Sequence, residues 1–340
     1  MRPDLRGAVV PAAEQRVPRP EPAPGSARPG RGVDLFLLTV AISGISLSAP
    51  LIAATAAPAL AIAFWRNAMA MGVLTPVALL RHRSELRRMS RRTWLLAGAA
   101  GALLALHFAL WLPSLHMTSV ASSTALVTTT PIWTTVLLRM RGHRPPRMVW
   151  AGIGIAFLGV LLLTGVDLSL SPRALAGDAL ALAGGMAAAG YVLLGAEVRR
   201  TVSTTAYTFV CYGTTALLLL VACLVSGADL GGGYSAETWL KLAVLTVAAQ
   251  LLGHSLLNRV VRGLGPSVTS TAILLETPGA ALIAALWLGQ TPPLVAYPAL
   301  AVIMVGLLVV LRASGRSADP QPAVPLPTPA QSPAPARTEQ

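Results

Sequence analysis

Residues 123–146 read STALVTTTPIWTTVLLRMRGHRPP, and residues 270–293 read STAILLETPGAALIAALWLGQTPP. In this single ungapped register, 147 residues apart, both segments carry Ser-Thr-Ala, then Thr-Pro, then a closing Gly-x-x-Pro-Pro. The same shift places His107 on His254 and Gly159 on Gly306. The chain therefore contains an internal repeat.

The repeat belongs to a chain built from long apolar blocks. Of its 340 residues, 54% are hydrophobic and 11% are charged, whereas about a quarter of an ordinary soluble domain is charged. A helix of about 20 continuous apolar residues crosses a hydrocarbon layer about 30 Å thick, and these blocks lack the alternation of a membrane β-strand. We predict an all-α integral membrane protein with ten transmembrane helices, over residues 35–54, 59–80, 94–113, 119–138, 148–165, 176–196, 205–226, 239–258, 267–288 and 294–311.

The charged loops between the blocks predict the orientation, because arginine and lysine concentrate in cytoplasmic loops. With a cytoplasmic N-terminus, fourteen loop arginines lie on the cytoplasmic side and only Arg173 and Lys241 lie outside. Ten crossings return the C-terminus to the cytoplasm. We expect a multi-pass protein of the cell (plasma) membrane with both termini cytoplasmic. The net charge of +13 is assigned to these loops, not to a nucleic-acid surface.

Each copy of the repeat contains five predicted spans. Because five is an odd number, the second copy is inverted in the membrane relative to the first. The predicted organisation is a disordered N-terminal tail over residues 1–32, five-helix repeats over 33–165 and 166–311, and a disordered Pro/Ala-rich C-terminal tail over 312–340. Inverted repeats are a recurring construction of transporters, whose two halves exchange conformations around a site at their interface.

Both copies also resemble the EamA-type permeases of the drug/metabolite transporter superfamily, over about residues 35–311. In the first copy the resemblance rests on His107-Phe108-Ala109-Leu110-Trp111, Ser114-Leu115, Thr118-Ser119-Val120-Ala121-Ser122-Ser123 and Thr130-Pro131. In the second copy it rests on Gly253-His254, Asn258, Gly265-Pro266, Leu275-Glu276 and Pro278.

The resemblance implies a ten-helix transporter in which spans three, four, eight and nine line a central cavity. It implies export or uptake of small metabolites, from a family range of amino acids, sugars, nucleosides and toxic cations. The turns after the fourth and ninth spans usually end in Gly-Glu in this family. Here His143 and Gln290 follow the glycine, so no role of those glutamates is carried over.

Two formally charged residues, Arg66 and Glu276, lie well inside predicted spans. A charge in the membrane interior costs at least about 2.5–3.5 kcal/mol and is a functional hypothesis by default. At helical rise, Arg66 lies about 10 Å and Glu276 about 16 Å below the outer face, a difference that an arginine side chain can bridge. We expect both to share one polar cavity, with Glu276 as a proton or cation site. Snorkelling of Arg66 and a structural hydrogen bond of Glu276 are the alternatives.

Aromatic and histidine side chains supply further candidates for substrate binding or coupling. His107 and His254 are related by the repeat, and an imidazole titrates near pH 6.5, which suits a proton relay. The alternative is that both histidines only pack between helices, because a packing role would also recur in both copies of the repeat. Trp111 can stack on a substrate or face lipid.

A Thr-Pro pair occurs at the same place in both copies. Pro131 and Pro278 each leave a backbone carbonyl without its helical partner. Within a membrane such carbonyls persist where protein or cavity water satisfies them, and Thr130 and Thr277 lie beside them. We predict hinges and cavity-lining residues here, with simple packing kinks as the alternative.

No metalloprotease helix, P-loop or nucleophile elbow occurs, and we predict neither an enzyme nor a cofactor or metal site. We expect a secondary-active exporter of a small metabolite or drug-like solute, working by alternating access, with proton coupling as the accompanying hypothesis. The alternatives are an uncoupled facilitator and a membrane-embedded protein that does not transport. The expected partners are the solute and the lipid bilayer. A homodimer through the short fifth and tenth spans stays open, as do the substrate, the direction and the coupling ion.

Overall fold

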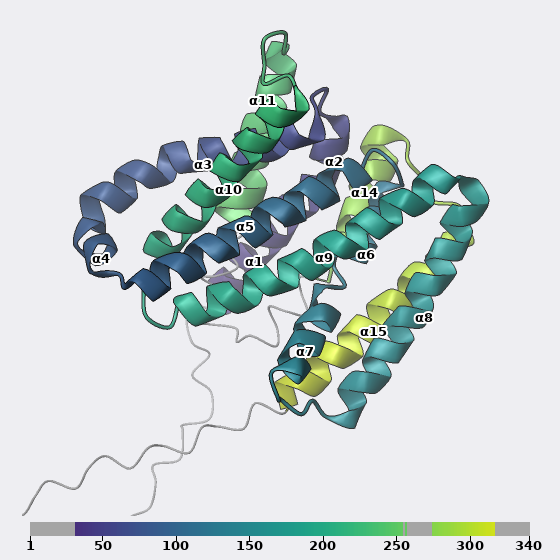
Figure 1. Ribbon diagram of the computed structural model, residues 1–340. Helices are drawn as coiled ribbons and strands as arrows, with labels where there is room; N and C mark the ends of the chain where they lie inside the picture. The colour runs from purple at the N-terminus through teal and green to yellow at the C-terminus, as the bar shows by residue number, and fades with distance from the viewer. Residues whose placement is uncertain (1–30, 254–255, 257–273, 317–340) are drawn as a thin grey trace, which may run out of the picture.

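The computed structural model describes residues 31–253, 256 and 274–316, and every regular element within these ranges is a helix (Figure 1). The first half forms α1 (Arg31–Ser46), α2 (Ser48–Ala54), α3 (Ala59–Arg81), α4 (Arg83–Arg88), α5 (Arg91–Ser114), α6 (Val120–Val127), α7 (Thr130–Met140) and α8 (Arg147–Leu170). The second half forms α9 (Pro172–Val198), α10 (Thr204–Ser226), α11 (Ala236–Leu245), the π-helix η1 (Thr246–Gly253), α14 (Glu276–Leu288) and α15 (Ala296–Arg316).

All ten predicted ranges contain helix in the part that the structure describes. Among the described residues, six helical segments are long and apolar enough to cross a membrane: Gly32–Ala54, Ala59–Arg81, Arg91–Ser114, Pro172–Val198, Thr204–Ser226 and Ala296–Ala313. The predicted fourth span is interrupted between α6 and α7, and the eighth changes from α11 to η1. Parts of the eighth and ninth ranges lie outside the described residues.

Three helix ends cross the boundaries predicted for the repeats and tails. Helix α8 continues to Leu170, beyond the boundary predicted between the repeats. Helix α15 continues to Arg316 and α1 begins at Arg31, so both enter residues that the sequence assigns to the tails. The rest of both tails lies outside the described residues. The fifth and tenth spans, which are the shortest by sequence, are helices of 24 and 21 residues.

Serine side chains begin five of the helices. In each case Oγ accepts a hydrogen bond, at 3.0–3.2 Å, from the backbone N–H three residues later; the serines are Ser90, Ser119, Ser171, Ser203 and Ser235. Such caps satisfy N–H groups that the first helical turn leaves unpaired. Ser90 begins α5 and Ser235 begins α11, which are the third segments of the two copies. The cap is therefore part of the internal repeat.

Helices α8 and α15 pack closely along their length (Figure 1). A Cβ atom on Gly159 would stand 2.6 Å from the backbone nitrogen of Ile303, and Gly306 meets the backbone of Ala156 in the same way. Only a residue without a side chain allows two helices to approach so closely. The repeat relates Gly159 to Gly306, so the fifth and tenth segments present matching faces to each other.

Helix α5 lies between α10 and α9, and α3 packs against α10 (Figure 1). The main buried core is drawn mostly from α2, α3, α5, α10, α11 and α14, while α6 to α9 and α15 share a second core. Helix α1 packs against η1 and α14, so the first helix of one copy contacts the other copy. The polar residues of the candidate site lie where α3 packs against α5 and η1.

Candidate functional site

A buried polar network joins α3 to η1. Arg66 and Asn67 of α3 are 2% and 0% exposed, and Gln250 of η1 is 3% exposed. Arg66 Nε donates to Gln250 Oε1 at 2.8 Å, and Gln250 Nε2 donates to Asn67 Oδ1 at 3.1 Å. Asn67 Nδ2 donates to the Ala63 carbonyl at 2.8 Å. Because both amides use their donor and their acceptor, the network orients all three side chains and links the two copies.

The backbone that carries Gln250 is unusual. Residues Thr246–Gly253 form a π-helix, a rare form that is frequent at functional sites. On its other side η1 packs on α1, where a Cβ on Gly44 would stand 2.6 Å from the Ala248 carbonyl oxygen. The π-helix η1 therefore makes a close backbone contact with α1 and a polar contact with α3.

A row of rings on α5 lies beside Arg66. The guanidinium carbon of Arg66 is 4.5 Å from the centroid of the Phe108 ring, which is a cation–π contact. The Phe108 ring is 5.0 Å from the His107 ring, and the His107 ring stacks on Trp111 at 5.5 Å. His107 Nδ1 is 3.0 Å from the Gly184 carbonyl oxygen of α9. The row thus connects Arg66 to the interface of α5 with α9.

Two donors along this row are buried and lack a hydrogen-bond partner within the described part of the chain. They are Nη1 of Arg66 and Nε1 of Trp111, and Trp111 is 5% exposed. Leaving a buried donor unpaired costs about 1–3 kcal/mol, and more for a charged group. These two donors are therefore the strongest candidates to bind a ligand.

Glu276 faces the same region from α14. It is the first residue of that helix, it is half-buried, and its charge interacts with that of Arg66. Tyr212 of α10 also interacts electrostatically with Arg66. No hydrogen bond or ion pair connects the described side chains of Arg66 and Glu276 directly. Opposite charges thus face each other without contact.

A turn lies shortly before the Thr-Pro pair of each copy. Helix α6 ends at Val127 and α7 begins at Thr130, while α14 begins at Glu276 after a turn. In the first copy, Thr130 Oγ1 donates to the Val127 carbonyl at 2.8 Å. This is the carbonyl that Pro131 leaves without a backbone donor.

The residues around the two Thr-Pro pairs are in contact across the copies. Thr128 Oγ1 is 3.2 Å from Thr277 Oγ1, where α6 packs against α14. Thr277 is 2% exposed, and Pro278 lies beside it in the first turn of α14. Thr130 Oγ1 also approaches the Gly185 carbonyl of α9, at 3.4 Å.

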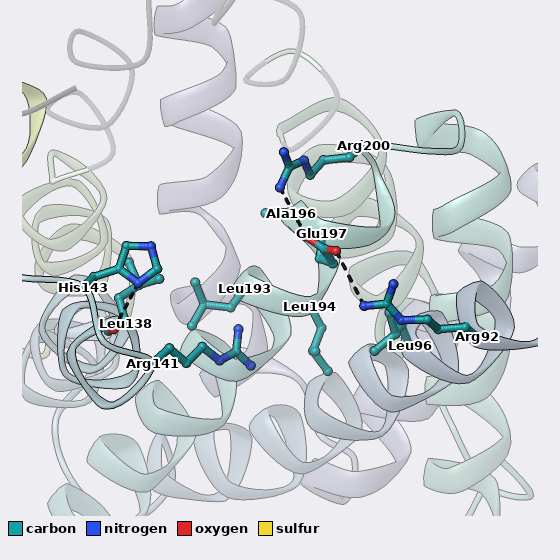
Figure 2. A pocket seen from close by; sticks show the side chains of 10 residues that line it. All are labelled: Arg92, Leu96, Leu138, Arg141, His143, Leu193, Leu194, Ala196, Glu197 and Arg200. Atoms are coloured by element: carbon teal, nitrogen blue, oxygen red, sulfur yellow. Dashed lines mark hydrogen bonds and ion pairs between the residues drawn. The ribbon is translucent and has the colours of Figure 1, made fainter. Parts of the chain in front are cut away.

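A recess of about 470 Å³ opens among the ends of α5, α7 and α9 (Figure 2). Arg92, Arg141 and Arg200 lie around it, and Glu197 lies between two of them. The carboxylate of Glu197 is 3.9 Å from Arg92 Nη2 and 3.5 Å from Arg200 Nη1. The recess is therefore basic, and it lies among residues that the sequence places at the cytoplasmic surface.

The structure brings part of the predicted site together. Arg66, His107 and Trp111 share one row of contacts, with Glu276 within electrostatic reach of Arg66. The Thr-Pro residues form a separate group at the helix breaks: Thr130, Pro131, Thr277 and Pro278. His254 lies outside the described residues.

Sequence reasoning missed three residues around Arg66, namely Asn67, Phe108 and Gln250. A signal was present for the amides, because Asn67 directly follows Arg66 and Gln250 lies inside an apolar block. Neither amide carries a formal charge, so neither is as conspicuous in an apolar block as Arg66 or Glu276. Nothing in the sequence distinguishes Phe108 from the other apolar residues of its helix.

Metal-ligating side chains are dispersed in the described ranges. No three His, Cys, Asp or Glu side chains gather there as metal ligands. Cys211 and Cys223 are both buried free thiols on α10.

Comparison with known proteins identifies a family. A model of the EamA-like transporter family matches residues 30–165 and 175–312, in two stretches that follow the internal repeat. A solved structure described only as "Crystal structure of protein" aligns with a TM-score of 0.56 at 16% identity, over 82% of this chain and 97% of its own. At that identity the likeness concerns the fold alone. No match was found among curated proteins.

Proposed function

The chain belongs to the EamA-like transporter family, and on this premise we propose that it is a secondary-active exporter of a small metabolite or drug-like solute, working by alternating access. The observation that carries the proposal is the buried Arg66–Gln250 contact between the two copies. Charges inside a membrane are rare, partnered and usually functional. Because this contact spans the copies, a conformational exchange between them must rearrange it.

The proposed architecture is ten membrane crossings in two inverted five-helix copies, in the plasma membrane, with both termini cytoplasmic. Three observations support it: the family model matches two separate stretches, all ten predicted ranges contain helix in their described parts, and the serine cap of the third segment recurs in the second copy. In this orientation the basic recess of Figure 2 lies on the cytoplasmic side, where a solute bound for export enters.

Glu276 is the proposed proton site. A carboxylate in low-dielectric surroundings takes up a proton more readily than one in water. Protonation removes the negative charge that faces Arg66, so it changes the electrostatic balance of the network that joins α3 to η1. His107 is the proposed relay, because an imidazole can gain and lose a proton near neutral pH and its ring lies beside Phe108, which contacts Arg66.

The two Thr-Pro pairs, Thr130-Pro131 and Thr277-Pro278, are the proposed hinges. Both lie at the contact of α6 with α14, where Thr128 meets Thr277. A hydroxyl can exchange one acceptor for another at modest net cost, since a neutral hydrogen bond contributes about 0.5–1.5 kcal/mol. Helix α14 can therefore move relative to α6 without leaving many hydrogen-bonding groups unpaired on the way.

The test is transport by purified protein in liposomes that contain a pH-sensitive dye. The solute panel is amino acids, nucleosides, sugars and lipophilic cations. Glu276→Gln runs in parallel with Glu237→Gln, a matched control in which the same substitution affects an exposed glutamate that pairs with Lys241 at 2.7 Å. Efflux from preloaded cells measures the direction.

A solute-dependent proton flux in the wild type and Glu237→Gln, lost in Glu276→Gln, is the expected result. Solute flux without proton movement in all three proteins supports an uncoupled facilitator instead. Absence of any solute flux from folded protein contradicts the transport proposal and favours a lipid-active or scaffolding role.

A further inference from the structure

Arg66 has more hydrogen-bonding capacity than its surroundings use. Its Nε is bound by Gln250, its guanidinium lies over Phe108, and its Nη1 is buried without a partner among the described residues. Within the described part of the chain, a neutral amide and a ring contact it, and no carboxylate there forms an ion pair with it. Removing one partner of a buried charge is strongly destabilising, so a buried guanidinium in such surroundings favours an anionic partner.

The guanidinium is also oriented in advance. The bond from Nε to Gln250 and the contact with Phe108 restrict the rotation of the side chain, which directs Nη1 away from the amide that holds Nε. A planar guanidinium matches the geometry of a carboxylate, and charge-assisted bonds of this kind are about twice as strong as neutral ones. Little ordering entropy is therefore lost when an anion binds.

Trp111 supplies a second unused donor, on α5, the helix that also carries Phe108. It follows Phe108 by three residues, about one helical turn, and the His107 ring lies against both. Both unused groups, Arg66 Nη1 and Trp111 Nε1, are donors. The complementary ligand group is therefore an acceptor, and the rings between the two donors suit an apolar ligand body.

Glu276 limits the charge of that acceptor. Its negative charge interacts with Arg66, so a dianion such as a phosphate monoester would meet one cation and one opposing carboxylate. A single carboxylate matches the charge better. If the ligand is a zwitterion, Glu276 can attract its ammonium group.

We infer that the transported solute carries one carboxylate, which binds Nη1 of Arg66 while its apolar part lies along Phe108 and Trp111. This inference deepens the proposed transport function and rests on it. It narrows the substrate class to monoanionic or zwitterionic carboxylates, and it makes Arg66 the group that selects them.

The test compares each carboxylate with its own carboxamide. Proteoliposomes are assayed with radiolabelled amino acids and short-chain monocarboxylates, their carboxamides, and phosphate monoesters. The wild type is expected to favour at least one carboxylate over its carboxamide by about tenfold or more in kcat/KM, which corresponds to one charge-assisted hydrogen bond. Arg66→Met is expected to lose this preference, and Arg66→Lys to reduce it.

A pair of tryptophan variants keeps the test decisive if the Arg66 variants fail to fold. Trp111→Phe removes the unused N–H and is expected to lower carboxylate transport by about three- to tenfold. Trp133→Phe is the matched control, because its N–H already donates to Thr129 Oγ1 at 3.2 Å. Equal loss in both variants, or equal transport of carboxylates and carboxamides by the wild type, overturns the inference and leaves the transport proposal standing.

Thermal stabilisation of the detergent-purified protein separates the two proposals when no solute moves. In that case, a carboxylate that stabilises the wild type while its carboxamide does not, with the effect lost in Trp111→Phe, supports the carboxylate site. The absence of flux then contradicts the transport proposal. If neither flux nor such stabilisation is seen with folded protein, both proposals fail.

Discussion

The α8–α15 interface and the α3–η1 contact both join the two repeat copies, but by opposite means. Helices α8 and α15 meet through glycine and apolar side chains, with Gly159 against the backbone of Ile303. Helices α3 and η1 meet through Arg66 and Gln250, which are fully buried and polar.

The difference indicates which contact is permanent. A contact of glycine with the backbone of the neighbouring helix has one good geometry, because a small shift produces either overlap or a void in a close-packed interior. A polar network can exchange one partner for another. We therefore interpret α8–α15 as the fixed support and α3–η1 as the contact that changes during transport.

Placing a leucine at Gly159 is expected to have the largest effect. Its Cβ alone would stand 2.6 Å from the Ile303 backbone nitrogen, and the overpacking is expected to cost more than about 3 kcal/mol. We expect little monodisperse protein on size-exclusion chromatography. Gly154→Leu on the same helix is the control, because nothing lies within 4 Å of a Cβ there. Wild-type behaviour of Gly159→Leu would show that the interface is not fixed.

Gln250→Leu is expected to have the next largest effect, about 1.5–3 kcal/mol, because it leaves the charge of Arg66 buried without its acceptor. The informative quantity is the sign of the coupling free energy between this substitution and Arg66→Met. The double variant Arg66→Met/Gln250→Leu is expected to be more stable than Gln250→Leu alone, since it removes the stranded charge. Unfolding of all four proteins of the cycle measures this, and simple additivity would argue against the network.

Thr277→Val tests whether the crossing of α6 with α14 belongs to the fixed or the changing region. It removes the hydroxyl contact with Thr128, for which we expect a stability loss of about 0.5–1.5 kcal/mol and a clear change in solute flux. Thr134→Val is the control, because that hydroxyl donates within its own helix to the Thr130 carbonyl at 3.0 Å. A stability change with normal flux would assign the crossing to the fixed region.

The smallest expected effect concerns Glu85 on α4, outside both regions. Its carboxylate accepts hydrogen bonds from the backbone and hydroxyl of Ser203, at 2.5 and 2.7 Å, and lies 2.9 Å from His82 Nδ1. Partial burial alone raises the pKa of Glu85, but these hydrogen bonds outweigh it and lower the pKa below the ordinary 4.5.

Because the pKa of Glu85 is lower in the folded chain than in the unfolded chain, its contribution to stability is complete above about pH 4.5. The contribution is lost as the pH falls through the folded value. We expect Glu85→Gln to remove this acid-dependent part, which is below about 1 kcal/mol for so accessible a group. Melting temperatures of the wild type and of Glu85→Gln, measured across this range, check it, and identical pH profiles of the two proteins would contradict it.

The helix positions were largely predictable because a bilayer forces backbone groups to pair within the segment. The apolar blocks at residues 59–80 and 205–226 therefore match α3 and α10 within two residues. The interruption at Thr128-Thr129 was not predicted as a helix end, because Pro131 indicates only a kink near that point. The close contact of α8 with α15 depends on glycines, and the sequence does not show which residues of the other helix these glycines contact.

By itself the sequence determined a chain of long apolar helices with an internal repeat, and it exposed Arg66 and Glu276, because a charge inside an apolar block is conspicuous wherever it occurs. Only the tertiary structure decided what surrounds Arg66. Gln250 is 184 residues away along the chain, and Phe108 is an ordinary apolar residue until its ring lies beside the guanidinium. Helix packing brings these distant residues together. It therefore decides which hydrogen-bond donors have a partner within the protein and which remain available to a ligand.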